Sequence, residues 1–175
     1  MQLCLRSVCQ DDLVQTLKWH SDQELSRLTG GRRLPITEVD ELAWYSGLSH
    51  CRDQAILIVD QGGEAVGLVG LYDIDWVART ARSGLMVDPQ HQDAGVGTQA
   101  YSMLIDYAEN SLGLRRLWAM IVVGNEASLR LHDRLGFERE GVLRQHWFVD
   151  GALADVNVVG RCTPAAGVVR QQDAP

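Results

Sequence analysis

The sequence predicts a single domain of the α+β class, which some classification schemes would place with the α/β proteins. Its length of 175 residues, with 46% hydrophobic and 22% charged residues, suits one domain with a substantial core. Runs with the two-residue period of strands are interspersed with runs that have the 3.6-residue period of helices, in the order β-α-α-α-β-β-β-α-β-α-β-β. No repeat or internal linker interrupts this order, so we assign residues 1–162 to the domain and predict a disordered tail over 163–175.

The N-terminal part is predicted to contain one short strand followed by helices. Alternation over residues 3–5 indicates the strand, and the polar residues 10–12 offer a cap for a helix that runs towards Trp19 and His20. A second helical segment, 22–28, is followed by two glycines that would end it.

A third helix is predicted to begin after Pro35, because Thr37 is a favourable N-cap residue. At helical spacing, Leu42, Tyr45 and Trp44 would face the interior. Such a face would pack this helix against the rest of the domain.

Three strands are expected next. Residues 55–59 and 65–72 are apolar runs, and the polar and glycine residues 60–63 between them indicate a hairpin turn. A further strand ends at Met86 and Val87. The three strands would form an antiparallel meander.

A glycine turn follows this strand and opens an amphipathic helix. Pro89 and polar residues stop the strand, and Gln92-x-x-Gly95-x-Gly97 leads into the helix. Glycines at such a turn let the backbone come close to a ligand, and the helix behind them contributes free amide groups and the positive end of its dipole. The turn therefore predicts a site for a diphosphate group.

Two common nucleotide sites are excluded by context. A dinucleotide-binding fold needs Gly-x-Gly-x-x-Gly after the first strand and an acidic residue about 20 positions later. Here the turn lies midway along the chain, follows an antiparallel meander and has two glycines. A P-loop needs Gly-Lys-Ser/Thr, which the sequence lacks.

The remaining elements follow from periodicity and turn residues. Leu112 and Gly113 would end the helix after the glycine turn, and 117–123 is an apolar strand of the buried kind. Asn125 would cap a short helix, and two last strands would flank a two-residue turn at 150–151. The expected inner face of the helix after the glycine turn consists of Val96, Ala100, Met103, Leu104, Tyr107 and Ala108.

Composition excludes several classes of protein. No apolar run approaches the roughly 20 residues that span a bilayer, and residues 1–6 do not resemble a signal peptide. The net charge is −7 and the basic residues are scattered, which disfavours nucleic-acid binding. The four cysteines form no metal-ligand spacing. We therefore expect a cytoplasmic protein that binds no metal, nucleic acid or membrane, as a monomer or homodimer.

At this point the sequence resembles the GNAT superfamily of acetyl-CoA-dependent N-acetyltransferases. The run from Gln92 to Thr98 resembles that family's pyrophosphate loop, and the run from Asn125 to Phe137 resembles its second motif, an asparagine followed by a helix that ends in Leu-Gly-Phe. Residues 140–144, with Asp150-Gly151 and Asp155, resemble the subgroup that contains ribosomal-protein N-terminal acetyltransferases and spermidine N-acetyltransferase. The resemblance implies a three-layer fold whose mixed, mostly antiparallel sheet is flanked by helices and splayed between the strands that end near 87 and 123.

The resemblance also implies which residues hold acetyl-CoA. Backbone amides of the glycine turn would bind the pyrophosphate, the preceding strand would run beside the pantetheine arm, and Asn125 would contact that arm or only cap its helix. Asp93 and Ala94 depart from the family, which often has a glycine and a basic residue there. The implied coenzyme residues are Met86, Val87, Gln92, Asp93, Ala94, Gly95, Val96, Gly97, Thr98 and Asn125.

Two residues are candidates for acid–base catalysis, His132 by resemblance and Asp75 by its position in the chain. His132 lies where many members carry a tyrosine thought to protonate the leaving thiolate, and an imidazolium could donate that proton. The alternative for His132 is a histidine that bonds Asp133 or solvent. Asp75, at a strand end, is a candidate general base, as are Asp73, His146 and Asp155, although a water chain could serve instead.

The acceptor is left open at three amines: a protein N-terminus, an aminosugar or antibiotic amine, and a polyamine. By resemblance the acceptor groove would include Trp19, His20, Asp22, Trp44, Tyr45, Tyr72 and Trp147. Trp19 and Trp44 also suit core packing. Arg82 stands where spermidine-type relatives carry an acidic residue, which disfavours a polyamine as the acceptor. A catalytically inactive acyl-CoA-binding sensor or partner-binding module with the same fold is the alternative function.

Overall fold

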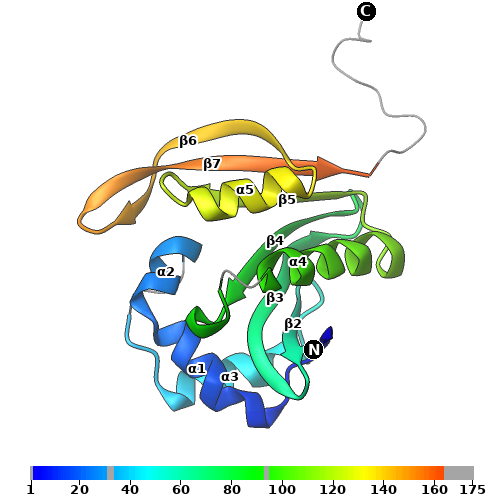
Figure 1. The fold of residues 1–175 in the computed structure, drawn as a ribbon, viewed down its shortest axis with the longest axis vertical. Coiled ribbons are helices and arrows are strands. Elements are labelled where there is room, and N and C mark those ends of the chain that lie inside the picture. The colour runs from blue at the N-terminus through cyan, green and yellow to red at the C-terminus, as the bar shows by residue number, and fades with distance from the viewer. Residues whose placement is uncertain (1, 31–33, 93–94, 164–175) are drawn as a thin grey trace, which may run out of the picture.

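A computed structural model describes residues 2–30, 34–92 and 95–163 (Figure 1). The strands are β1 (Leu3–Ser7), β2 (Ala55–Gln61), β3 (Glu64–Asp75), β4 (Thr80–Val87), β5 (Arg116–Val122), β6 (Glu138–Val149) and β7 (Ala152–Cys162). The helices are α1 (Leu13–Ser21), α2 (Gln23–Thr29), α3 (Glu38–Leu48), α4 (Val96–Asp106) and α5 (Glu126–Arg134). Short 3-10 turns cover Gln10–Asp12 and Pro89–His91, and a π-helical turn, Tyr107–Ser111, continues α4. The predicted order of elements is confirmed. The predicted tail lies outside the described residues, apart from Thr163.

The strands form one open sheet in the order β1-β2-β3-β4-β5-β7-β6. Every neighbouring pair is antiparallel except β4 and β5, which are parallel. That parallel pairing covers three residue pairs and ends at Arg82 opposite Trp118. Beyond it the two strands separate, as Figure 1 shows. The predicted mixed sheet and its splay are therefore confirmed.

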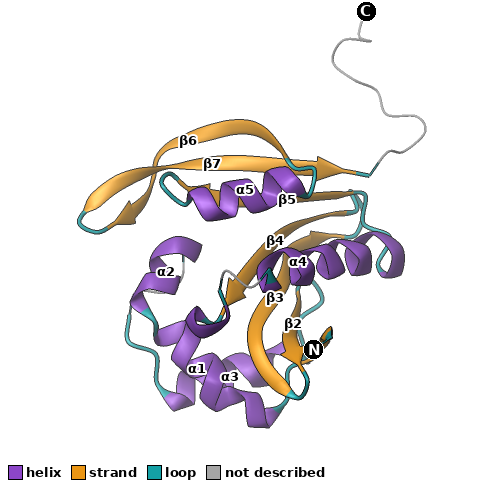
Figure 2. Ribbon diagram, in the orientation of Figure 1, coloured by secondary structure: helices purple, strands orange, loops and turns teal. Residues whose placement is uncertain are grey.

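Helices cover both faces of the sheet, so the domain has three layers (Figure 2). Adjacent strand residues point to opposite faces. Val59 and Val69 pack in the large core cluster with α4, whereas Ile58 and Leu68 pack on the other face with α1 and α2. Trp19, 2% exposed, fills this second core.

Turn and cap residues behave as their types predict. Asp150 and Gly151 both have positive φ, 50° and 79°, which a two-residue hairpin of type I′ requires. The Asn125 side chain accepts a hydrogen bond from Ser128 N at 3.1 Å and so caps α5. Thr37 caps α3 in the same way.

Two expected helix faces are wrong in detail. Leu42 is 49% exposed, and Glu41 is the buried residue of α3, because its carboxylate has hydrogen-bonding partners inside the fold. On α4 the buried face includes Tyr101 and Ile105, while Met103 and Tyr107 are half-buried. The helix is thus rotated relative to the expected face. None of the described helices is both long enough and apolar enough to cross a membrane.

Candidate active site

A cavity of about 540 Å³ opens where β4 and β5 separate. Residues from both halves of the chain line it, so its walls come from the N-terminal helices, the split strands, α5 and the end of β6. The residues that line it include His20, Thr29, Trp44, Tyr72, Arg82, Ser83, Met86, Val87, Gln92, Gly97, Asn125, Ser128, His132 and Trp147.

Gly97, in the first turn of α4, lines this cavity, and no described side chain caps the start of the helix. Gly95 is the N-cap residue, with φ 77° and no side-chain hydrogen bond to the helix. The first backbone N–H groups of a helix have no partner within it, and they carry the positive end of the helix dipole. Gly97 lies close to Leu85 and Leu131: a Cβ added there would come within 3.3 Å of Leu85. The amides at this end are therefore available to an anionic ligand.

One edge of β4 forms the floor of the cavity. Residues 83–87 line it and lie beyond the last residue pair with β5. The strand is fixed at its end because Asp88 Oδ2 accepts hydrogen bonds from Trp19 Nε1 at 2.7 Å and Gln15 Nε2 at 2.6 Å. On its other side β4 comes so close to β3 that a Cβ on Gly67 would lie 2.5 Å from the carbonyl oxygen of Met86.

A buried hydrogen-bond chain connects the cavity wall to His132. The Tyr101 hydroxyl lies 2.7 Å from Ser83 Oγ and 2.9 Å from His132 Nε2. His132 Nδ1 lies 2.8 Å from the carbonyl oxygen of Ser128, which can only accept, so Nδ1 carries the proton. Nε2 then accepts from Tyr101, whose oxygen accepts from Ser83.

Burial sets the protonation of this chain. It lowers the pKa of His132, which is 5% exposed, and raises the pKa of Tyr101, which is fully buried. Both shifts disfavour the charged form. Burial therefore favours the neutral imidazole of His132, whose Nε2 lone pair accepts the hydrogen bond from Tyr101.

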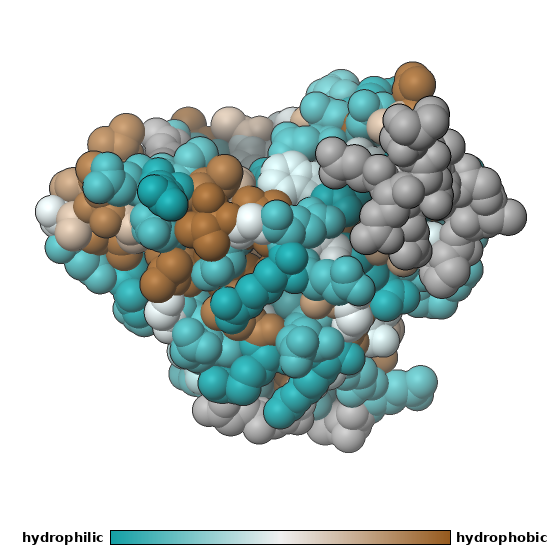
Figure 3. Space-filling view, turned by 90° about the horizontal axis from the view of Figure 1, so that it is seen from above, coloured by the Kyte–Doolittle hydropathy of each residue, from teal (hydrophilic) through white to brown (hydrophobic). Residues whose placement is uncertain are grey.

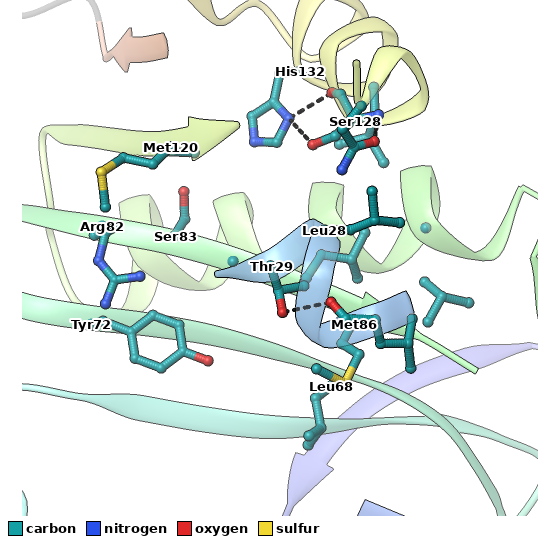
Figure 4. A pocket seen from close by; sticks show the side chains of 18 of the residues that line it. Leu28, Thr29, Leu68, Tyr72, Arg82, Ser83, Met86, Met120, Ser128 and His132 are labelled. Atoms are coloured by element: carbon teal, nitrogen blue, oxygen red, sulfur yellow. Dashed lines mark hydrogen bonds between the residues drawn. The ribbon is translucent and has the colours of Figure 1, made fainter. Parts of the chain in front are cut away.

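The opposite wall carries a cation over an aromatic ring. The Arg82 guanidinium lies 4.7 Å from the centre of the Tyr72 ring, and its Nε donates to Asp73 Oδ2 at 2.9 Å. Figure 4 shows Arg82 and Tyr72 across the cavity from His132 and Ser128. At the end of β6, Trp147 packs on Gly30, where an added Cβ would lie 2.6 Å from the indole ring.

The structure brings together most of the predicted site residues. Met86, Val87, Gln92, Gly97, Asn125 and His132 line the cavity, as do Trp44, Tyr72 and Trp147. Gly95 begins α4, Thr98 lies in its first turn and Val96 is buried in the core. Asp93 and Ala94 lie outside the described residues.

Other predicted residues lie elsewhere. Trp19 is a core residue that holds Asp88, and it is not part of the described cavity wall. Asp75 accepts hydrogen bonds from the backbone N–H groups of Val77 and Ala78 at 2.9 and 2.8 Å, so its carboxylate stabilises the β3–β4 turn. Of the other candidate bases, Asp73 is paired with Arg82, Asp155 accepts from the backbone of Gln145, and His146 is exposed on β6.

Sequence reasoning missed Tyr101, Ser83 and Glu41. Tyr101 follows Ala100, which was assigned to the buried face, so a slightly wider face would have included it. Ser83 lies on a strand and Glu41 on a helix, with no pattern around them that distinguishes them from surface residues.

Comparisons with known proteins agree with this geometry. A family model described as an acetyltransferase (GNAT) domain matches residues 2–138. The chain is 28% identical to an uncharacterized N-acetyltransferase, YoaA, of Bacillus subtilis (strain 168) over 174 residues, 93% of this chain and 94% of that one. It is 31% identical to spermidine N(1)-acetyltransferase of Escherichia coli (strain K12) over 107 residues, 61% of this chain and 58% of that one.

A solved structure has the same fold. The crystal structure of spermidine N-acetyltransferase from Vibrio cholerae in complex with CoA and spermine superposes with a TM-score of 0.88 at 23% identity, covering 92% of this chain and 95% of that one. The family model spans well over half of the chain. The two expected motifs lie at one cavity, in agreement with this match. The chain therefore belongs to the GNAT family of acetyl-CoA-dependent acetyltransferases.

Proposed function

We propose that acetyl-CoA binds in the split between β4 and β5 and that a primary amine attacks its acetyl group there. The uncapped start of α4 and the free edge of β4 open on the same cavity, and this observation carries the proposal. The pyrophosphate would bind the amides of residues 93–98, and the pantetheine arm would run along Met86 and Val87. Asn125 would cap α5 and also contact the arm.

The reaction is the aminolysis of a thioester. A neutral amine adds to the carbonyl carbon, the C–N bond forms, and the C–S bond breaks as the thiolate leaves. A backbone donor on the developing oxyanion is worth about 3–4 kcal/mol, and positioning both reactants contributes several more. Acid–base catalysis adds a factor of about 10²–10⁴.

His132 would act in the second half of this reaction. After addition the nitrogen carries a positive charge and must lose a proton, while the departing sulfur must gain one. The chain from Ser83 through Tyr101 ends at the Nε2 lone pair of neutral His132. We infer that His132 takes up this proton through the chain and returns it to the sulfur.

The cavity wall favours an acceptor that carries one amine. Among the described lining residues, Arg82 is a cation, whose ion-pair partner Asp73 lies outside the lining, and none is a carboxylate. A polyamine has several cationic groups to neutralise, whereas a peptide N-terminus or an aminosugar amine has one. We therefore infer a single-amine acceptor, although relatives include a spermidine N(1)-acetyltransferase.

A thiol-release assay tests this function. The protein is mixed with acetyl-CoA and a panel of a peptide with a free N-terminus, glucosamine, an aminoglycoside and spermidine, and binding of CoA is measured by calorimetry. Thiol release with the peptide or glucosamine supports the proposal, and release only with spermidine or the aminoglycoside, which both carry several amines, contradicts the acceptor class. CoA binding without turnover would favour the sensor, and absence of CoA binding would exclude both.

We also infer a homodimer in the cytoplasm. Figure 3 shows hydrophobic residues gathered where the β6–β7 hairpin turns, and Phe148 and Leu153 are 57% and 59% exposed there. An exposed apolar patch of this kind suits contact with a second copy. All four cysteines are free thiols, which suits a reducing compartment. Light scattering of the purified protein checks the dimer, and a monomeric mass would contradict it.

A further inference from the structure

A second histidine on the cavity wall is held by a buried carboxylate. His20, on α1, lines the cavity, and its Nδ1 lies 2.9 Å from Glu41 Oε2 and 3.0 Å from Oε1. Glu41, on α3, is 2% exposed, and its Oε1 also accepts from the Thr16 hydroxyl at 2.5 Å. The carboxylate thus has two partners, and one of them is the histidine.

This pairing fixes which ring nitrogen of His20 carries a proton. An ionised carboxylate can only accept, so Nδ1 is the donor. In the neutral imidazole Nε2 then has a free lone pair, and no hydrogen bond to Nε2 occurs among the described residues. The Trp44 ring packs edge to face on His20, with the ring centres 4.9 Å apart. A carboxylate that orients a histidine and stabilises its protonated form is the arrangement that general-base histidines use.

We propose that His20, oriented by Glu41, is the general base that removes a proton from the acceptor amine. The inference rests on the proposed function, since it assigns a residue to the acceptor side of the same cavity. An alkylamine enters as an ammonium ion and cannot attack the thioester until it loses a proton. His20 Nε2 takes this proton, and the resulting imidazolium is paired with Glu41.

The proton balance is complete with the two histidines. His20 accepts the first proton of the ammonium ion and releases it to solvent after the product leaves. The nitrogen loses the second proton after the C–N bond has formed. His132 takes up this proton and transfers it to the sulfur. Glu41 from α3 is the charged group in contact with His20, and the other charged or titratable residues among the described lining of the same cavity are Arg82, Tyr72 and His132.

The test compares wild-type protein with His20→Gln over a range of pH, using the panel amine that the wild type acetylates fastest. Near pH 7 the amine is protonated, so kcat/KM for the amine should fall by about 10²-fold or more in the variant. Above the pKa of the free amine no base is needed, and the two rates should converge. Glu41→Gln should show the same pH-dependent loss, and KM for acetyl-CoA should stay close to the wild-type value in both variants.

His50→Gln is the matched control, because His50 is exposed in the turn after α3 and outside the described cavity wall. Thermal unfolding of all variants identifies any that are misfolded, and either His20→Gln or Glu41→Gln suffices for the comparison. A loss that is equal at all pH values would overturn the proposal and leave His20 as a packing residue, and an unchanged rate would also overturn it. Absence of turnover by the wild type would instead overturn the proposed function, and this inference with it.

Discussion

Replacing Tyr101 with phenylalanine removes one hydroxyl group from the centre of the site and keeps the ring. That hydroxyl makes two buried hydrogen bonds, at 2.7 Å to Ser83 and 2.9 Å to His132. Ser83 can then turn its hydroxyl hydrogen to the Trp118 carbonyl oxygen at 3.3 Å, but His132 Nε2 is left without a donor. An orphaned buried acceptor and a lost bond together lower the free energy of unfolding by about 2 kcal/mol.

Urea unfolding measures this loss. With a slope of about 2 kcal/mol per molar urea, the midpoint should fall by about 1 M. Tyr107→Phe is the control: it lies on the turn that continues α4, is half-buried, and has no hydrogen bond from its hydroxyl among the described residues, so its midpoint should stay unchanged. Adding Ser83→Ala to Tyr101→Phe should cost less than the sum of the two changes, because they remove the same bond.

The same variant tests the proton relay. If His132 exchanges its proton with the cavity through Tyr101, kcat should fall by about 10-fold or more while KM for acetyl-CoA changes little. A variant with an unchanged unfolding midpoint would refute the buried hydrogen-bond chain. A destabilised variant with unchanged kcat would refute the relay alone.

Three further predictions follow from burial and close packing. Burial lowers the pKa of His132 in the folded protein below its reference value of 6.5, so the unfolded chain binds more protons near that pH. The free energy of unfolding should therefore fall as the pH drops through about 6.5. In urea unfolding, His132→Gln should show a flatter pH dependence than the wild type. Gly67→Ala places a Cβ 2.5 Å from the carbonyl oxygen of Met86 and should raise KM for acetyl-CoA; an unchanged KM would contradict the clash. Gly47→Ala, which has open space around it in α3, should instead raise the unfolding midpoint slightly. Arg6→Met leaves two buried carboxylates without their guanidinium partner and should lower the free energy of unfolding by about 2–3 kcal/mol, and a loss under about 0.5 kcal/mol would show that the ion pairs contribute little.

The glycine turn and the Asn125 cap could be predicted because both features are local in the sequence. The glycine turn before α4 and the Asn125 cap each depend on residue types within a few positions, and the structure places both at the cavity. The order of the elements followed from periodicity for the same reason. The splay of the sheet came from the resemblance rather than from any pattern in β4 or β5.

The acceptor side depends on contacts between residues far apart in the chain. Glu41 is buried because it meets His20 and Thr16 on another helix, and nothing near Glu41 in the sequence indicates this. Tyr101 meets Ser83 only when α4 packs on the sheet in one rotation. Asp75 seemed free at a strand end, but the backbone of its own turn uses its carboxylate.

The free edge of β4 has a consequence for how such a site changes over time. Along residues 83–87 the strand can offer a ligand main-chain amide and carbonyl groups, which every amino acid except proline carries in full. Substitution of side chains leaves such groups in place, provided that the backbone keeps its path. The rest of the lining includes side chains such as Arg82, Tyr72 and Trp147, and each of them can be replaced individually. A chain built in this way can keep the same acetyl donor while the amine that it acetylates changes.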